Sequence, residues 1–220
     1  MTHAFDKDYW EGVWRGDRAL AMAAGEPHPH LVAETRDLEP GAALEAGCGA
    51  GVEAVWLAGA GWRVTGADIA ADALARAAER AAAAGVADRV RWVEADLSVW
   101  EPEERFDLVT THYAHPATPQ LDFYDRLASW VAPGGTLLLV GHLHDEGHQH
   151  GSGHGHGHGH GHGEEAGPPA EASVRAADVV ARLDPARWEV VTATESRRTV
   201  TVPDGREVAV HDAVVRARRR

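Results

Sequence analysis

The sequence predicts an α/β fold, doubly wound, in which helices cover both faces of a mostly parallel sheet. Short β-branched or apolar runs alternate along the chain with segments of helical periodicity, which is the pattern of repeated βαβ units. The last two strand-like runs follow one another directly across the turn signal Pro203-Asp204-Gly205. The chain is therefore expected to end in an antiparallel hairpin.

Each element follows from a local pattern. Five apolar or β-branched runs are expected to form the parallel strands: Ala42–Ala46, Arg63–Ala67, Val90–Glu94, Phe106–Thr110 and Gly135–Gly141. Helical periodicity marks three further segments: Asp72–Ala84, Pro119–Val131 and Val174–Leu183. Gly85 follows the first of these helices at the position that favours a positive φ, and Pro133-Gly134-Gly135 turns the chain into the fifth strand. Trp188–Val202 and Glu207–Arg216 form the hairpin.

The composition is that of one globular domain spanning residues 1–220. Of these 220 residues 44% are hydrophobic and 25% charged, which is ordinary for a chain with one core. No apolar run approaches the roughly 18 residues of a membrane span. Residues 1–10 lack a signal-peptide pattern, and the single Cys48 cannot form an internal disulfide. We expect a cytoplasmic location and no membrane partner.

The charge distribution disfavours a nucleic-acid partner. The formal net charge is −13, and residues 1–170 carry 26 acidic side chains against 11 Lys and Arg. Such a chain repels a phosphate backbone, which nucleic-acid-binding proteins attract with clustered cations. The only lysine is Lys7, which argues against P-loop and pyridoxal enzymes because both need a lysine in the site.

One segment departs from the rest in composition. From Gly141 to Gly163 there are nine His and nine Gly, ending in strict alternation. Such a segment cannot build a core, so residues 143–170 are expected to be a flexible insertion. Alternating imidazoles can bind zinc or nickel, adventitiously or as a metal-storage function. The candidate ligands are His154, His156, His158, His160 and His162.

The strongest functional signal is Glu45-Ala46-Gly47-Cys48-Gly49-Ala50-Gly51, between the first strand and an Ala-rich helix. Glycines here let the backbone turn sharply and let a ligand approach main-chain amides at a helix N-terminus. Asp68 ends the second strand, where a carboxylate can accept both hydroxyls of a ribose, and Asp96 ends the third. These acids predict a nucleoside-cofactor site along the carboxyl edge of the sheet.

The identity of the cofactor follows from the charges near the glycines. Residues 49–54 also fit a dinucleotide fingerprint, so an NAD(P)-dependent oxidoreductase is the alternative. Glu45 would crowd a pyrophosphate, whereas the sulfonium and ammonium of S-adenosylmethionine tolerate nearby acids. The Tyr-x-x-x-Lys pair of short-chain dehydrogenases cannot form with Lys7 alone. The sequence therefore favours S-adenosylmethionine.

Over about residues 30–141 the chain resembles the class I S-adenosylmethionine-dependent methyltransferase family. The segment 45–51 is similar to its acidic-x-Gly-x-Gly-x-Gly first motif, Ala67-Asp68-Ile69 to its ribose-binding motif and Ala95-Asp96-Leu97 to its adenine-contacting motif. Phe106-Asp107-Leu108-Val109 and the segment 132–137 resemble the fourth strand and the turn into the fifth.

The resemblance implies a Rossmann-like, seven-stranded sheet in the order 3-2-1-4-5-7-6 and methyl transfer from S-adenosylmethionine. It also implies the cofactor-binding residues, which are Glu45, Gly47, Gly49, Gly51, Asp68, Ile69, Asp96, Leu97 and Thr111. Tyr9-Trp10-Glu11 and Gly25-Glu26-Pro27 are similar to small bacterial methyltransferases near the tellurite-resistance and thiopurine enzymes.

The segment after the fourth strand bears on the acceptor. It reads Thr110-Thr111-His112-Tyr113-Ala114-His115-Pro116 and lacks the Asn-Pro-Pro-Tyr tetrapeptide of enzymes that methylate DNA bases or protein glutamine. A small-molecule acceptor is therefore expected. His112 and His115 are the candidate catalytic residues because imidazole can take a proton near neutral pH; the alternative is that they pack in the pocket wall.

Aromatic residues cluster near the start of the chain. Tyr9, Trp10 and Trp14 lie within residues 1–30, which are expected to form a lid over the cofactor. Their rings could contact a sulfonium through cation–π interactions. Their spacing equally suits one face of a helix packed on the core.

Overall fold

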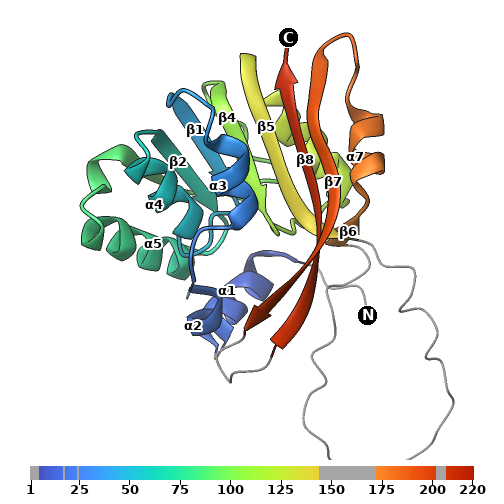
Figure 1. The fold of residues 1–220 in the computed structure, drawn as a ribbon. Coiled ribbons are helices and arrows are strands. Elements are labelled where there is room, and N and C mark those ends of the chain that lie inside the picture. The colour runs from blue at the N-terminus through green and yellow to red at the C-terminus, as the bar shows by residue number, and fades with distance from the viewer. Residues whose placement is uncertain (1–4, 17, 24, 144–171, 202–206) are drawn as a thin grey trace, which may run out of the picture.

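The computed structural model describes residues 5–16, 18–23, 25–143, 172–201 and 207–220. The sheet runs in the order β3-β2-β1-β4-β5-β8-β7, with one further short strand, β6, paired to β5 (Figure 1). The strands are β1 (Ala42–Ala46), β2 (Arg63–Asp68), β3 (Val90–Glu94), β4 (Phe106–His112), β5 (Val131–Leu143), β6 (Ser173–Val174), β7 (Trp188–Thr201) and β8 (Glu207–Arg219). All pairs are parallel except those of β8 with β5 and β7. The predicted order and closing hairpin are confirmed, and β6 is the one strand that the sequence did not predict.

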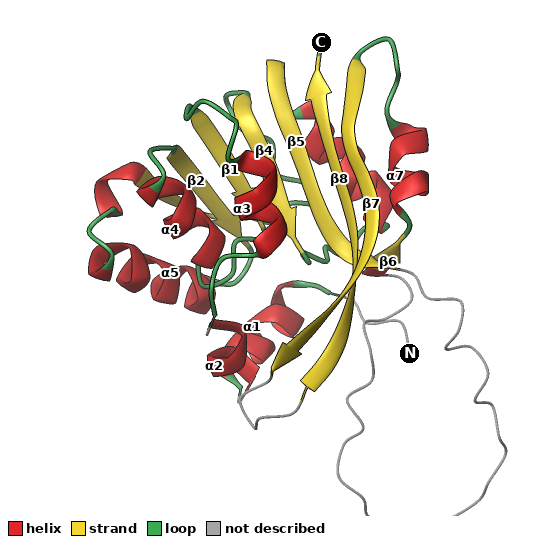
Figure 2. Cartoon of the chain, viewed as in Figure 1, coloured by secondary structure: helices red, strands yellow, loops and turns green. Residues whose placement is uncertain are grey.

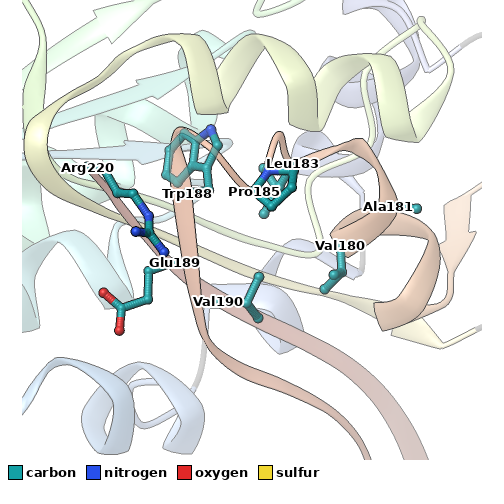
Figure 3. Close-up of a pocket in the computed structure, with 8 residues that line it drawn as sticks. All are labelled: Val180, Ala181, Leu183, Pro185, Trp188, Glu189, Val190 and Arg220. Carbon is teal, nitrogen blue, oxygen red and sulfur yellow. The ribbon is translucent and has the colours of Figure 1, made fainter.

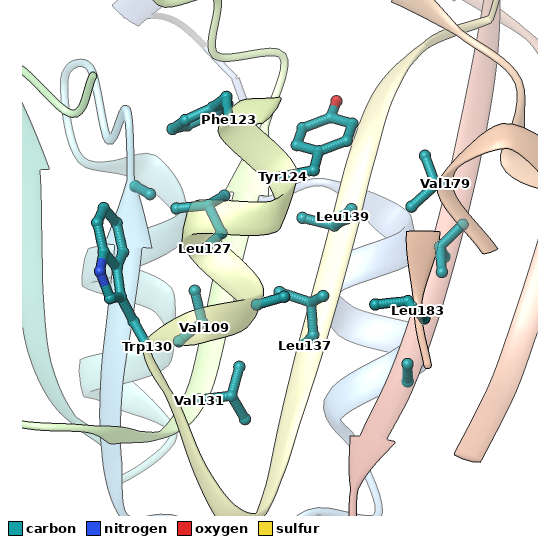
Figure 4. Packing of buried hydrophobic residues seen from close by; sticks show 14 of the residues in the cluster. Val109, Phe123, Tyr124, Leu127, Trp130, Val131, Leu137, Leu139, Val179 and Leu183 are labelled. Carbon is teal, nitrogen blue, oxygen red and sulfur yellow. The ribbon is translucent and has the colours of Figure 1, made fainter. Parts of the chain in front are cut away.

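Helices cover both faces of the sheet (Figure 2). They are α1 (Lys7–Arg15), α2 (Arg18–Ala23), α3 (Pro29–Thr35), α4 (Val52–Gly59), α5 (Ala71–Ala83), α6 (Gln120–Ser129) and α7 (Ala176–Arg182), with a 3₁₀ turn at Ala87–Arg89. On one face, Leu31 of α3 and Leu57 of α4 are buried in a cluster with the strand residue Leu138. On the other face, α6 and α7 enclose the larger cluster drawn in Figure 4. In the described residues no helix is long and apolar enough to cross a membrane.

The α3/α4 face of the sheet becomes polar toward the carboxyl ends of the strands. Glu45 on β1 pairs in register with Thr110 on β4, and His112 lies two residues further along β4, so all three side chains share this face. His142 on β5 pairs with Asp212 on β8. The sheet thus brings side chains from three parallel strands and from the antiparallel β8 to one edge of one face, which is where the sequence predicts the cofactor site.

The strand β5 begins earlier than the sequence predicts. Val131 pairs with Phe106, but the next paired residue on β5 is Thr136, opposite Leu108. Residues 132–135 therefore bulge from the ladder, with Gly134 at a φ of 80°. The predicted Pro-Gly-Gly turn is an irregularity inside β5, because β5 pairs with β4 on both sides of it, with a shifted register after it.

The predicted His/Gly-rich insertion, residues 143–170, begins one residue too early, because Leu143 is the last residue of β5. Residues 144–170 lie outside the described residues. The predicted metal ligands His154, His156, His158, His160 and His162 are part of this range.

Candidate active site

The glycine loop joins β1 to α4 with three residues in the left-handed region. Gly47, Gly49 and Gly51 have φ values of 74°, 50° and 77°. A Cβ atom at Gly47 would lie 2.3 Å from the Cβ of Ala114, and one at Gly51 would lie 2.8 Å from the Cβ of Ala77. Both the backbone conformation and the packing therefore require glycine, as the sequence predicts.

Asp68 holds this loop in place. Its Oδ2 accepts a hydrogen bond from the Gly49 amide at 2.8 Å and its Oδ1 accepts one from the Ala70 amide at 2.9 Å. Burial raises the pKa of the Asp68 carboxyl, while these backbone amides act in the opposite direction. A carboxylate has about four acceptor positions, so these bonds leave Asp68 with acceptor capacity for a ribose. Its neighbour Ile69 is partly buried at the same strand end.

The third predicted strand end is held next to the second. The Ala95 amide donates a hydrogen bond to the Asp68 carbonyl at 2.9 Å. Asp96 is exposed and its Oδ1 accepts bonds from the Ser98 amide at 2.9 Å and the Ser98 hydroxyl at 2.6 Å. Leu97 is buried in the core on the α6/α7 face. The acids at positions 45, 68 and 96 thus lie within, at the end of and just after the neighbouring strands β1, β2 and β3, along one edge of the sheet.

Glu45 and His112 form a buried pair. The Glu45 Oε1 and His112 Nδ1 atoms are 3.0 Å apart, and the two side chains are 1% and 5% exposed. Burial opposes charge on the His112 ring, but the Glu45 carboxylate outweighs it, and the pKa of His112 is raised. Next to the pair, the Thr111 hydroxyl donates to the Ala46 carbonyl at 2.7 Å, which ties the end of β4 to that of β1. One of the two predicted catalytic histidines is therefore held by a residue predicted to contact the cofactor.

His115 lies in different surroundings. Its Nδ1 is 3.3 Å from the Gln120 Oε1, and its carbonyl accepts a hydrogen bond from the Trp10 indole at 3.1 Å. The Phe5 and Trp10 rings lie 5.7 Å and 6.5 Å from its ring. Burial lowers the pKa of His115, so the ring is neutral at pH 7.

The N-terminal aromatic segment packs on the glycine loop. Trp14 of α1 is 3% exposed, and a Cβ atom at Gly49 would lie 2.9 Å from its ring. Arg15 joins α1 to α5 through an ion pair with Asp72 at 2.8 Å. Helix α1 therefore covers the loop directly, and its Trp10 and Trp14 contact different parts of the predicted site.

The fold and the motif residues agree with comparisons to known proteins. A family model described as a methyltransferase domain matches residues 43–135, which run from β1 into the bulge of β5. Together with the strand order and the glycine loop, this match shows that residues 43–135 are similar to a methyltransferase domain. The antiparallel β8 between β5 and β7 agrees with the strand order that the resemblance implies and differs from the dinucleotide-binding fold, whose sheet ends in the parallel order 4-5-6.

Curated relatives of this chain come from plants as well as bacteria. It is 32% identical to "Probable thiol methyltransferase 2" of Arabidopsis thaliana over 143 residues, 62% of each chain. It is 36% identical to "Thiocyanate methyltransferase 1" of the same plant over 103 residues, 46% of this chain and 44% of that one. The chain thus spans between two fifths and two thirds of the length of these two relatives.

A solved structure shares the fold over the whole chain. The N-methyltransferase NodS from Bradyrhizobium japonicum WM9, in complex with S-adenosylhomocysteine, superposes with a TM-score of 0.66 at 18% identity. The match covers 99% of both chains. It includes the terminal hairpin, beyond the region matched by the family model.

The structure also holds a second polar cluster, which the sequence did not predict. Arg198 on β7 donates from Nε to the Asp212 Oδ2 at 2.7 Å and from Nη2 to the Tyr113 hydroxyl at 2.9 Å. The Tyr113 hydroxyl donates to the Asp212 Oδ1 and lies 3.0 Å from the His28 Nε2. Tyr113 has a φ of 55°, a region that non-glycine residues seldom adopt. We call Arg198, Asp212, Tyr113 and His28 the hairpin cluster.

The hairpin cluster connects three distant parts of the chain. His28 precedes α3, Tyr113 follows β4, and the ion pair comes from the hairpin. Asp212 is fully buried, burial raises the pKa of Tyr113, and burial lowers the pKa of His28 to about 2. Its members therefore form a fixed hydrogen-bonded wall beside the predicted catalytic segment.

Two hollows in the described structure lie away from this site. One, of about 530 Å³, lies between α7, the start of β7 and Arg220 (Figure 3). The other, of about 300 Å³, lies at the starts of β1, β2 and β3. Both are at the opposite edge of the sheet from the glycine loop and contain none of the predicted site residues. Neither hollow is therefore part of the predicted site.

No metal centre accompanies the site in the described parts of the chain. Within them, no group of three or more His, Cys, Asp or Glu side chains is arranged to hold a metal ion.

Proposed function

We propose that this chain transfers a methyl group from S-adenosylmethionine to a small-molecule acceptor. The observation that carries the proposal is the glycine loop, in which three left-handed glycines are held by Asp68 at the adjoining strand end. S-adenosylmethionine supplies an electrophilic methyl group on a sulfonium. The names of the curated relatives, a thiol and a thiocyanate methyltransferase, support a small and nucleophilic acceptor.

The roles of the chain's own residues follow from their positions. The glycines at 47, 49 and 51 leave room for close approach to the main chain, and Asp68 accepts from ribose hydroxyls. We assign further contacts with S-adenosylmethionine to Ile69, Asp96, Leu97 and Thr111. We assign base catalysis to His112 or His115. Since alignment and exclusion of water account for much of the rate of such a displacement, covering of the site by α1 is part of the function.

The organisation of the chain belongs to the same proposal. Residues 1–220 act as a single methyltransferase domain, with residues 1–30 as the lid and residues 143–170 as an insertion that can bind zinc or nickel. The net charge of −13 supports the absence of a nucleic-acid partner. A cytoplasmic location completes the proposal.

Calorimetric titration with S-adenosylmethionine tests this function. Asp68→Ala should weaken binding at least tenfold, because hydrogen bonds to a charged acceptor contribute about 1.5 to 3 kcal/mol each. Asp107→Ala is the matched control: its carboxylate also accepts a backbone bond, from Ala42 at 2.8 Å, but at the opposite edge of the sheet. Unchanged affinity in folded Asp68→Ala would refute the ribose assignment. Heat from NADH and none from S-adenosylmethionine would refute the function.

A further inference from the structure

Three buried polar atoms at the end of β1 and β4 have no hydrogen-bond partner in the described structure. They are the Glu45 Oε2, the Thr110 Oγ1 and the His112 Nε2. Glu45 and Thr110 are register partners, and His112 shares their face of the sheet. Buried polar atoms are nearly always paired, so three unpaired ones in one place indicate a site that a polar ligand completes.

The geometry of the pair determines which atom of His112 can react. The Nδ1 atom lies 3.0 Å from the Glu45 carboxylate, which in the neutral ring places the proton on Nδ1. The lone pair is then on Nε2. Because Nε2 is the unpartnered atom, the ring presents a proton acceptor to whatever enters the site.

We propose that Glu45 and His112 form a general-base dyad and that the methyl acceptor is a nucleophile that carries a proton, such as a thiol. This inference rests on the proposed function. The Nε2 lone pair of His112 takes the proton while the acceptor's lone pair forms the bond to the methyl carbon. The electron pair of the broken carbon–sulfur bond stays on sulfur, giving a thioether. His112 becomes an imidazolium, which the Glu45 carboxylate stabilises.

The dyad distinguishes the two candidate histidines. His115 faces the neutral amide of Gln120, whereas His112 has a carboxylate partner. Glu45 is therefore a positioning residue for His112 in this proposal, in place of the cofactor contact expected from the sequence. His112 is the catalytic residue.

Other charged groups around His112 act on the same equilibrium. Glu53 of α4 also favours the charged ring, and its carboxylate accepts the His28 amide at 3.3 Å. The His28 ring lies 5.4 Å from the His112 ring and is neutral, held on its other side by Arg198 and Tyr113. The base form of His112 is present above its raised pKa, so methylation of a proton-bearing acceptor should increase as pH rises through that pKa.

The first test needs no turnover. The full chain is labelled at histidine, and the His112 signal is identified by its loss in His112→Gln, with His112→Asn as a second variant. In Glu45→Gln the His112 pKa should fall by at least one unit. The control is Glu34→Gln, whose carboxylate bonds to Thr192 at 2.8 Å, and it should leave the His112 titration unchanged. Identical titration of His112 in the wild type and Glu45→Gln overturns the dyad.

The second test compares acceptors. 2-Mercaptoethanol and phenol carry a proton to lose, whereas thiocyanate is an anion without one. His112→Gln should slow the proton-bearing probes by about 10²- to 10⁴-fold and thiocyanate by less than tenfold, with unchanged affinity for S-adenosylmethionine. Glu45→Gln should move the acid limb of the pH profile to lower pH, which a structural role would not do.

The outcomes separate this inference from the proposed function. Equal slowing of all probes by His112→Gln, or turnover of thiocyanate alone by the wild type, overturns the proton-transfer role. Failure of S-adenosylmethionine to bind the wild type overturns the proposed function. The titration of His112 does not need the cofactor, so it still tests the dyad. If no probe is methylated, that titration decides the dyad.

Discussion

The ion pair of the hairpin cluster gives the sharpest prediction about stability. Asp212 is fully buried and accepts from the Arg198 Nε at 2.7 Å and from Tyr113. In Asp212→Asn the negative charge of the carboxylate is removed, whereas the Arg198 guanidinium keeps its positive charge. Removing one partner of a buried pair costs about 3 to 5 kcal/mol because the other charge is left without compensation.

The partial exposure of Arg198 lowers this expected cost. The Arg198 side chain is 26% exposed, so water stabilises part of the unpaired guanidinium, and we expect a loss of about 2 to 4 kcal/mol. At roughly 2 to 4 °C per kcal/mol for a chain of this length, the melting temperature should fall by about 4 to 16 °C. The loss should appear in urea unfolding as a lower midpoint with an unchanged slope.

A second Arg–Asp pair in β8 provides the matched control. Arg216 donates to both oxygens of Asp37 at 3.1 Å, but the Asp37 side chain is 61% exposed. Asp37→Asn should therefore cost no more than about 1 kcal/mol. The reasoning is wrong if both variants lose the same stability, or if Asp212→Asn unfolds at the wild-type midpoint.

Three further predictions follow. Gly47→Ala should weaken S-adenosylmethionine binding more than tenfold by calorimetry, because the new Cβ would lie 2.3 Å from a neighbouring alanine at a φ of 74°; Gly59→Ala, with open space around it, should bind normally, and equal affinities would contradict this. Burial lowers the pKa of His28 to about 2 and that of His142 to about 4, so both rings take up a proton at a higher pH in the unfolded chain than in the folded one. The free energy of unfolding is therefore unaffected by them above the unfolded pKa of about 6.5 and falls as pH decreases from there toward 4. The loss is at most about 1.4 kcal/mol per pH unit for each histidine. Urea unfolding at several pH values between 7 and 5 should show that the free energy of unfolding changes less with pH in His142→Gln than in the wild type. An equal change with pH in the two proteins would refute the assignment. Replacing residues 144–166 by a short Gly-Ser linker should preserve the melting temperature and cofactor affinity and abolish retention on a nickel column, since loop-closure cost grows only logarithmically; loss of cofactor binding would show that the tract has a role in the site.

The glycine loop and the position of Asp68 beside it could be predicted from the sequence because their signals are local. The glycines form one continuous motif, and Asp68 stands directly at the end of a recognisable strand. Parallel pairing then brings these neighbours to one edge without further information. The bounds of β1 and β3 were predicted for the same reason, since each is a short apolar run between turns.

The hairpin cluster could not be predicted because its members are far apart in the sequence. Arg198 lies in a polar run that resembles a solvated strand, and only the crossing of the hairpin brings it to Tyr113. One signal was present: Asp212 shares the two-residue period of Val210 and Val214, which marks an acid on a core-facing position. The Glu45–His112 pair was missed because the pairing of β1 with β4 joins residues 67 positions apart.

The position of β8 has a consequence for how the chain is made. It is translated after every other strand of the sheet, yet it lies between β5 and β7. While the ribosome is still reading residues before 207, the outer edge of β5 exposes main-chain donors and acceptors, which is a template for wrong pairing. The half of the sheet that carries the glycine loop, from β1 to β4, has all its strands by residue 112 and can form during synthesis. The hairpin cluster, by contrast, waits for Asp212, so a nascent chain that ends before this residue can form the glycine loop but lacks the contacts of the cluster.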